Sequence, residues 1–182
     1  SFDWRDETAQ PIVLDFLDPM NRISEVLVNG SAVQWTASND HIVLPARSAQ
    51  AGANSIELTF IAGDEAFNRS EEFLYALFVP DRAHFSLPLF DQPNLKGRVT
   101  WQVAAPVQWQ VIANGPAVSV DETGERRVHS FAETEPMPTY LFAVAAGLFE
   151  KETALVDGRE INMYHRETDR EKVQRNTEAI FQ

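Results

Sequence analysis

The stretch Phe85–Val103, FSLPLFDQPNLKGRVTWQV, joins an apolar loop to the start of a strand. In its second half, every second residue from Val99 to Val103 is apolar, which is typical of a strand with one buried face. Its first half contains Pro88 and Pro93, which exclude a regular helix or a central strand. This half nevertheless carries more large apolar side chains than a surface connection needs, namely Leu87, Leu89, Phe90 and Leu95. We therefore expect the loop to be covered by other parts of the protein.

The composition of the chain excludes several functional classes. The 182 residues have a formal net charge of -12, and their hydrophobic share of 44% is that of a folded protein. Because an acidic chain repels phosphate backbones, we expect no nucleic-acid partner. The absence of cysteine excludes disulfides, thiolate zinc sites and cysteine nucleophiles. The longest apolar run, Tyr140–Phe149, is too short to span a membrane. We expect a soluble protein of the cytoplasm or the periplasm, and the sequence does not decide between them.

Short apolar segments separated by polar turns run through most of the chain. Two of them end in Asn-Gly, at Asn29-Gly30 and Asn114-Gly115, a strong turn signal because both residues tolerate positive φ. The predicted strands cover residues 11–17, 23–30, 31–36, 41–46, 54–62, 73–79, 98–104, 109–115, 126–132, 139–150 and 160–166. Short strands at this spacing predict an all-β fold, built as an antiparallel β-sandwich or a curved open sheet assembly.

The C-terminal end of the chain has a helical pattern. Thr168 and Glu171 have the spacing of a capping box, and Val173, Ile180 and Phe181 then fall on one helical face. We predict that an α-helix starts here, and that a domain boundary lies near residues 166–170.

The residues with catalytic potential form no recognisable constellation. The four histidines lie in separate predicted strands or loops, and we interpret them as having no special role, with a zinc site built from distant residues left open. Neighbouring acids on a strand point to opposite faces, which does not favour an acid–base pair. The chain contains no G-x-S-x-G elbow and no glycine-rich phosphate loop. Trp101 and Trp109 are interpreted as core residues, with an exposed aromatic platform as the alternative.

Three motifs, in order, resemble the N-terminal β domain of aminopeptidase N-like zinc metallopeptidases, the family that includes the leukotriene hydrolases. LPLFDQPNLKG resembles the family's Phe-Asp-Glu-Pro-x-Leu-Lys signature. WQVIANGPAV is similar to its Trp-x-x-x-Ser-Asn-x-Pro strand and turn. MPTYLFAVAAGLFE is similar to its Met-Ser-Thr-Tyr-Leu-hydrophobic-Gly-x-Phe strand. The likeness runs from about Asp15 to the end of the chain.

The resemblance implies a domain organisation. Residues 1–166 would form a noncatalytic, saddle-like β domain, and residues 167–182 would begin a zinc catalytic domain. The zinc would be held downstream by an HExxH motif and a further Glu, and no HExxH occurs in these 182 residues. The resemblance therefore implies no cofactor or metal site in this chain, the downstream catalytic domain as its partner, and peptides as substrates of the whole protein. The alternative is a noncatalytic binding or scaffolding module from a member that has lost peptidase activity.

The resemblance also implies a substrate contact that this chain lacks. In the family, a Gln-x-Glu in a Tyr-Thr-Gln-x-Glu-Pro context meets the free amine of the substrate. The corresponding stretch here is YALFVP, in which Tyr75 and Pro80 match. Leu77 stands at the position of the Gln, and Val79 at that of the acid. Both polar anchors are therefore absent.

The signature loop itself supplies the remaining candidate residues, which are Phe90, Asp91, Gln92, Pro93 and Lys96. We expect Phe90 and Leu95 to pack inward or against the missing domain. We expect the Asp91 carboxylate to close the turn before Pro93, with Lys96 as its charge partner.

Overall fold

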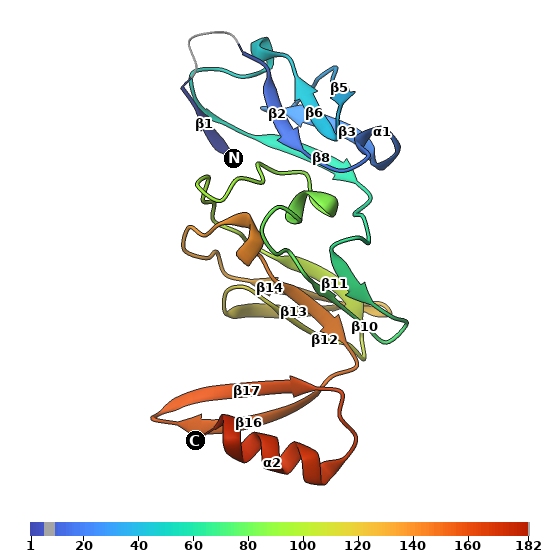
Figure 1. Cartoon of the computed structure of the whole chain (residues 1–182), viewed down its shortest axis with the longest axis vertical. Helices are drawn as coiled ribbons and strands as arrows, with labels where there is room; N and C mark the ends of the chain where they lie inside the picture. Colours follow the sequence, from blue (N-terminus) through green and yellow to red (C-terminus); the bar gives the residue numbers. More distant parts are fainter. Residues whose placement is uncertain (6–9, 182) are drawn as a thin grey trace. The chain divides into compact units, whose positions relative to one another are not determined.

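The computed structural model describes residues 1–5 and 10–181 of the chain (Figure 1). They form two compact units, and each unit is described by itself. The first comprises residues 1–68, 75–100 and 133–143, and the second comprises residues 69–74, 101–132 and 144–182. Gln182, the last residue of the predicted 167–182 segment, lies outside the described residues. Within the described parts of the chain, no helix combines the length and the apolar character that a membrane crossing needs.

The first unit contains a small β-sandwich. One layer is a sheet of order β2-β6-β5 and the other is a sheet of order β4-β3-β8, with all pairings antiparallel. A separate pair, β1-β7, accompanies them. The strands are β1 (Phe2–Trp4), β2 (Ile12–Asp15), β3 (Ile23–Val28), β4 (Ser31–Ala32), β5 (Thr36–Ser38), β6 (His41–Leu44), β7 (Gly52–Asn54) and β8 (Ile56–Phe60); helix α1 spans Pro19–Arg22.

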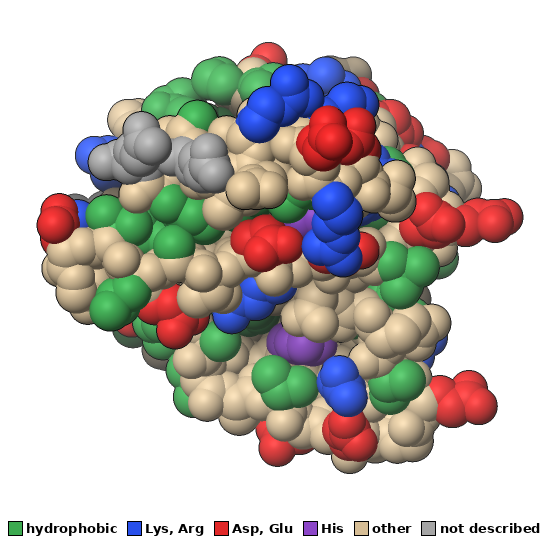
Figure 2. Space-filling view, turned by 90° about the horizontal axis from the view of Figure 1, so that it is seen from below, with side chains coloured by type: hydrophobic (Ala, Val, Ile, Leu, Met, Phe, Trp, Pro, Cys, Tyr) green, Lys and Arg blue, Asp and Glu red, His purple; other side chains and the backbone are tan. Residues whose placement is uncertain are grey.

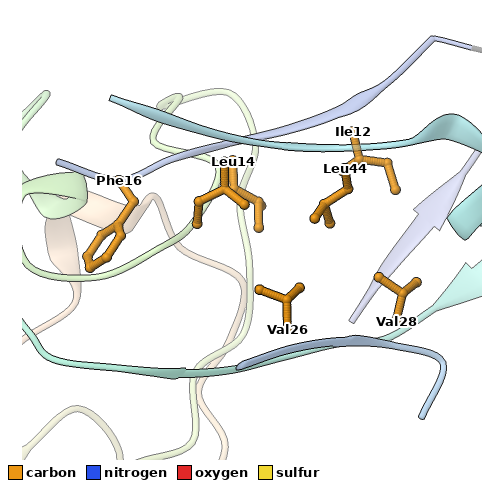
Figure 3. Close-up of a cluster of buried hydrophobic side chains, with 7 residues drawn as sticks. Ile12, Leu14, Phe16, Val26, Val28 and Leu44 are labelled. Carbon is orange, nitrogen blue, oxygen red and sulfur yellow. The ribbon is translucent and has the colours of Figure 1, made fainter. Parts of the chain in front are cut away.

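Alternating apolar residues of the two layers build the core of this sandwich. Ile12 and Leu14 on β2 and Leu44 on β6 point toward Val26 and Val28 on β3, as Figure 3 shows. All of these side chains are buried, because successive side chains of a strand point to opposite faces and every second one meets the other sheet. The 3₁₀ turns of this unit are Ala46–Ser48, Ala83–Phe85 and Thr139–Leu141.

The second unit contains a three-stranded antiparallel sheet of order β11-β14-β13 and the hairpin β16-β17. A four-stranded sheet has the order β12-β15-β10-β9. The remaining elements of the chain are β9 (Phe67–Arg69), β10 (Phe73–Ala76), β11 (Gln102–Pro106), β12 (Gln110–Ala113), β13 (Ala117–Thr123), β14 (Arg126–Phe131), β15 (Val144–Gly147), β16 (Glu150–Val156), β17 (Arg159–His165) and helix α2 (Arg170–Ile180).

The structure confirms the all-β, antiparallel sandwich class and corrects several element boundaries. The strand predicted over 98–104 begins at Gln102, although the alternation of half-buried and exposed residues already starts at Val99. The strand predicted over 73–79 ends at Ala76. The segment predicted as one strand over 139–150 divides into a 3₁₀ turn and β15, because the backbone amides of Leu141 and Phe142 bond locally to Pro138 and Thr139. The strands β1, β5, β7, β9, β13 and β16 were not predicted.

The C-terminal helix is confirmed, but its predicted cap is wrong. Asp169, not Thr168, is the N-cap residue, and its Oδ1 accepts the backbone N–H groups of Glu171 at 3.0 Å and Lys172 at 3.3 Å. A carboxylate at this position satisfies two free amides and also carries the negative charge that a helix N-terminus favours. Val173 is buried, Phe181 is half-buried and Ile180 is exposed.

Candidate functional site

The segment after β10 presents two apolar side chains to solvent. Leu77 is 44% exposed and Val79 is 52% exposed, whereas Phe78 between them is 3% exposed. Phe78 packs in a cluster with Ala66 and Ala83. Side chains therefore keep alternating between the two faces beyond Ala76, the last residue of β10. As a result, Leu77 and Val79 point away from the core.

Backbone hydrogen bonds hold this segment in place. The N–H of Leu77 donates to the carbonyl of Ala66 at 2.8 Å, and the carbonyl of Val79 accepts from the N–H of Arg82 at 3.0 Å. Tyr75, which matches the family pattern, accepts a hydrogen bond of 2.6 Å from the side-chain amide of Asn68. Leu77 and Val79 thus form an exposed apolar surface on a segment that backbone hydrogen bonds hold in place. Neither side chain has an atom that accepts a hydrogen bond from an ammonium group.

The signature loop is fixed to the sandwich at its start. Leu89 and Asp15 exchange both backbone hydrogen bonds, at 2.8 and 3.2 Å. The ring of Phe90 packs against the sandwich core and lies edge-on to Phe2, with the ring centroids 5.7 Å apart. The first half of the loop is therefore covered within its own unit, and the apolar residues before Asp91 need no second domain to explain them.

Asp91 is the centre of a hydrogen-bond network. Its side chain is 3% exposed. Its Oδ1 accepts the hydroxyl of Thr139 at 2.6 Å, and its Oδ2 accepts the backbone N–H of His84 at 3.1 Å. The ring Nδ1 of His84 lies 2.8 Å from the same Oδ2 and carries the proton between them, because an ionised carboxylate is acceptor only. The backbone N–H of Asp91 donates to Oδ2 of Asp15 at 2.8 Å.

This network keeps the carboxylate ionised. Burial by itself would raise the pKa of Asp91, but the hydrogen bonds from Thr139 and His84, together with the charge of His84, outweigh it and hold the pKa below its ordinary value. Asp91 therefore acts as a negatively charged acceptor that ties three chain segments together.

The remaining residues of the loop are exposed, and two predictions about them are wrong. The turn is closed by the backbone, with the N–H of Leu95 donating to the carbonyl of Gln92 at 2.9 Å, and not by the Asp91 carboxylate. Asp91 pairs with His84 instead of Lys96. Leu95 is 45% exposed, and Gln92, Pro93 and Lys96 are also exposed. The Asp91 carboxylate points inward, where His84 and Thr139 occupy its oxygens.

The interpretation of His84 as a residue without special role is also wrong. His84 lies on the 3₁₀ turn Ala83–Phe85, five residues after Val79. Its hydrogen bond to Asp91 ties the chain segment that follows Leu77 and Val79 to the signature loop. Thr139 and Asp15 were missed as well. The position of Thr139 inside the MPTYL motif was the one feature of the sequence that could have indicated its role. No pattern in the sequence indicated the pairing of His84 with Asp91, because it depends on how the signature loop folds back onto the turn Ala83–Phe85.

Asp81, His84 and Asp91 offer ligand atoms within 4.8 Å of one another. We tested this group as a zinc site against its hydrogen bonds. Both oxygens of Asp91 already accept hydrogen bonds, and Nδ1 of His84 donates one of them. Asp81 is almost fully exposed, with its Oδ1 4.0 Å from Nδ1. These three residues therefore do not fit the zinc site built from distant residues that the sequence left open.

The WQVIANGPAV motif has a structural role in the second unit. Gly115 follows β12 with φ +83°, and a Cβ there would lie 2.3 Å from the carbonyl oxygen of Ala132. The indole N–H of Trp101 donates to Asn114 at 3.3 Å. Trp101 and Trp109 both pack against the buried cluster of this unit, as predicted. These residues shape the sheet and bring no catalytic group together.

On the face drawn in Figure 2, Lys and Arg side chains lie among Asp and Glu side chains. Arg22 pairs with Glu65 at 2.8 Å, and Arg127 with Glu122 at 2.7 Å.

The described residues thus form antiparallel β sheets with an exposed apolar surface at Leu77 and Val79, and they bring no catalytic constellation together. Comparison with known proteins gives the family. Residues 65–141 match the peptidase M1 N-terminal domain. This segment contains Leu77 and Val79, and also His84, Asp91 and Thr139 of the hydrogen-bond network. Residues 65–141 of the chain thus carry the peptidase M1 N-terminal domain, and the similar curated relatives and solved structures are aminopeptidases and M1 zinc metallopeptidases.

Curated relatives are similar over most of this chain. It is 28% identical over 140 residues to probable aminopeptidase 1 of Sulfurisphaera tokodaii, covering 71% of this chain and 17% of the relative. It is 23% identical over 164 residues to leucine aminopeptidase 2 of Neurospora crassa, covering 78% of this chain and 24% of the relative. The chain therefore spans about a fifth of the length of the relatives that it matches.

Solved structures show the same fold. Aminopeptidase A of Legionella pneumophila superposes with a TM-score of 0.75 at 17% identity, over 88% of this chain and 20% of that one. The M1 zinc metallopeptidase of Deinococcus radiodurans superposes with a TM-score of 0.67 at 20% identity, over 85% of this chain and 39% of that one.

Proposed function

We propose that this domain forms one wall of the substrate cleft in a zinc-dependent aminopeptidase-like metallopeptidase. A downstream HExxH domain would hold the zinc and hydrolyse the peptide bond. The observation that carries this proposal is the geometry of Leu77 and Val79. Both side chains point outward from a firmly held segment, at the positions where the family resemblance implies contact with the substrate amine.

The chemistry of these two residues alters what the wall recognises. A hydrogen bond to a charged group contributes about 1.5–3 kcal/mol, so replacing both polar anchors weakens recognition of a free ammonium by an order of magnitude or more. An apolar wall instead favours apolar substrate groups. The whole protein is thus a peptidase with altered substrate preference.

The domain organisation belongs to the same proposal. Residues 1–166 form the noncatalytic β domain, and residues 167–182 begin the catalytic domain, which is the partner of this surface. The exposed side chain of Ile180 on α2 supports this boundary, since an apolar residue at a helix end gains stability when a following segment covers it. The saddle-like arrangement of the β domain remains part of this prediction.

A noncatalytic scaffolding module is the second candidate. The observation in its favour is the loss of both amine anchors, which a peptidase acting on free N-termini would need. In this case the domain serves as an interaction platform, and the zinc site of the whole protein is also degraded.

The experiment uses the full-length gene product. We expect an HExxH motif with a downstream Glu, one zinc per chain by metal analysis, and hydrolysis of aminoacyl reporter substrates. A full-length protein without zinc and without hydrolysis would refute the peptidase proposal and support the scaffold. A protein with both, but insensitive to changes at residues 77 and 79, would leave the peptidase assignment standing and refute the wall.

A further inference from the structure

A cavity of about 600 Å³ opens into the sandwich of the first unit. It lies where β2 and β8 are the edge strands of their two sheets, and Leu14 on β2 and Leu58 on β8 reach it from the two layers. Phe2 and Trp4 on β1 form a further wall, and Phe90 and Leu95 of the signature loop form another. The cavity is of the size and apolar character that small-molecule sites have in proteins.

The polar groups around this cavity restrict the ligand. Asp3 lines it, but Phe2 and Trp4 pack against the sandwich core, so strand alternation turns the Asp3 side chain to the opposite face. Thr139 also lines it, but its hydroxyl is already donated to Asp91. Among the described side chains at the cavity, Lys96 is the one that brings a charge to its rim, and it is exposed in the turn after Leu95.

We propose that this cavity binds a small amphipathic carboxylate, such as a medium-chain fatty acid. The apolar tail lies between the rings of β1 and the signature loop and reaches Leu58, and the carboxylate meets the ammonium group of Lys96. The tail gains by leaving water for an apolar cavity, and the head group stays at the solvent boundary where its charge is not desolvated. The site is separate from Leu77 and Val79 and does not depend on the presence of a zinc domain.

Calorimetric titration of this chain with decanoate, below its critical micelle concentration, tests the proposal. We expect saturable binding of one decanoate per chain, with hexanoate binding more weakly. Lys96→Gln should weaken decanoate binding about five-fold, the size of an exposed ion pair, and should leave the binding of uncharged decanol unchanged. Lys151→Gln, in the hairpin β16-β17, is the matched control and should change neither. Lack of saturable binding, or equal decanoate affinity in Lys96→Gln, would overturn the proposal.

The location of the ligand is tested separately by fluorescence. A bromine at the end of the decanoate chain quenches a nearby indole, and Trp4 lines the cavity. We expect saturable quenching in the natural chain and little quenching in Trp4→Phe, which keeps an aromatic ring on β1. Because Trp35, Trp101 and Trp109 remain in that variant, quenching that persists in Trp4→Phe would place the ligand elsewhere and refute the site.

Discussion

The hydroxyl of Thr139 donates a hydrogen bond of 2.6 Å to Oδ1 of Asp91, across 48 residues of chain. This contact joins two of the motifs that gave the family resemblance, FDQP and MPTYL. A buried carboxylate needs its acceptor sites filled, and Thr139 and His84 fill them. The two motifs therefore occur together for a physical reason, since each satisfies a group of the other.

Asp91→Asn should destabilise the chain by about 2–3 kcal/mol, because the negative charge is lost and one of the two acceptor oxygens that Thr139 and His84 use becomes an NH2 donor. Thr139→Val should cost about 1–2 kcal/mol. Since both changes break the same hydrogen bond, their combined effect in urea unfolding should be smaller than the sum. Lys96→Gln is the control and should leave stability unchanged. Fully additive effects would contradict the shared bond.

Phe90→Ala should destabilise the chain by about 2–4 kcal/mol, because the ring packs against the sandwich core and Phe2. Leu95→Ala, five residues later in the same loop, should change stability by less than about 0.5 kcal/mol because its side chain is largely exposed. Melting temperatures of the two variants test this difference. An unchanged melting temperature for Phe90→Ala would place the ring outside the core of its own unit.

Gly147→Ala should cost about 1–3 kcal/mol through overpacking. A Cβ at this position would lie 2.7 Å from the Cβ of Phe73 and 2.8 Å from the carbonyl oxygen of Glu72. Gly97→Ala is the matched control, because a Cβ at Gly97 would have no neighbour within 4 Å. Chemical unfolding of both variants checks the prediction, and equal stabilities would refute the close approach of β15 to β10.

His129 should make the domain less stable at mildly acidic pH. Burial, and secondarily the charge of Arg127, lower the pKa of His129 in the folded state below its ordinary value of 6.5. Between the two pKa values the unfolded chain binds the extra proton, so the free energy of unfolding falls as the pH drops below about 6.5. Unfolding from pH 7.5 to 5.5 should therefore show a steeper loss of stability in the natural chain than in His129→Gln. Parallel pH profiles would disprove this role.

In the full-length protein, Leu77→Gln combined with Val79→Glu should lower the KM for aminoacyl reporter substrates. The pair restores the two acceptors for the substrate ammonium, and we expect an effect of about ten-fold. Both side chains are exposed, so the stability of the isolated domain should stay the same. Leu95→Gln, another exposed leucine of the unit, is the control. Unchanged KM and kcat/KM would show that positions 77 and 79 do not face the amine.

The sequence by itself determined the all-β class, most strands and the C-terminal helix. These follow from local rules: side chains alternate along a strand, Asn-Gly forms tight turns, and apolar residues repeat along a helix. The short strand β7 was missed because three residues, Gly52–Asn54, show too little periodicity. The motif order gave the family without any structure.

Only the tertiary structure decided which partners the signature loop has. From the sequence we expected Lys96 as the charge partner of Asp91, whereas the structure supplies His84 and Thr139. Such long-range pairing depends on how the loop returns to the sandwich, and no local pattern encodes it. The same holds for Leu77 and Val79, whose exposure follows from the burial of Phe78 between them. Local propensity thus specifies the elements, and the packing between distant segments specifies the surface that they present.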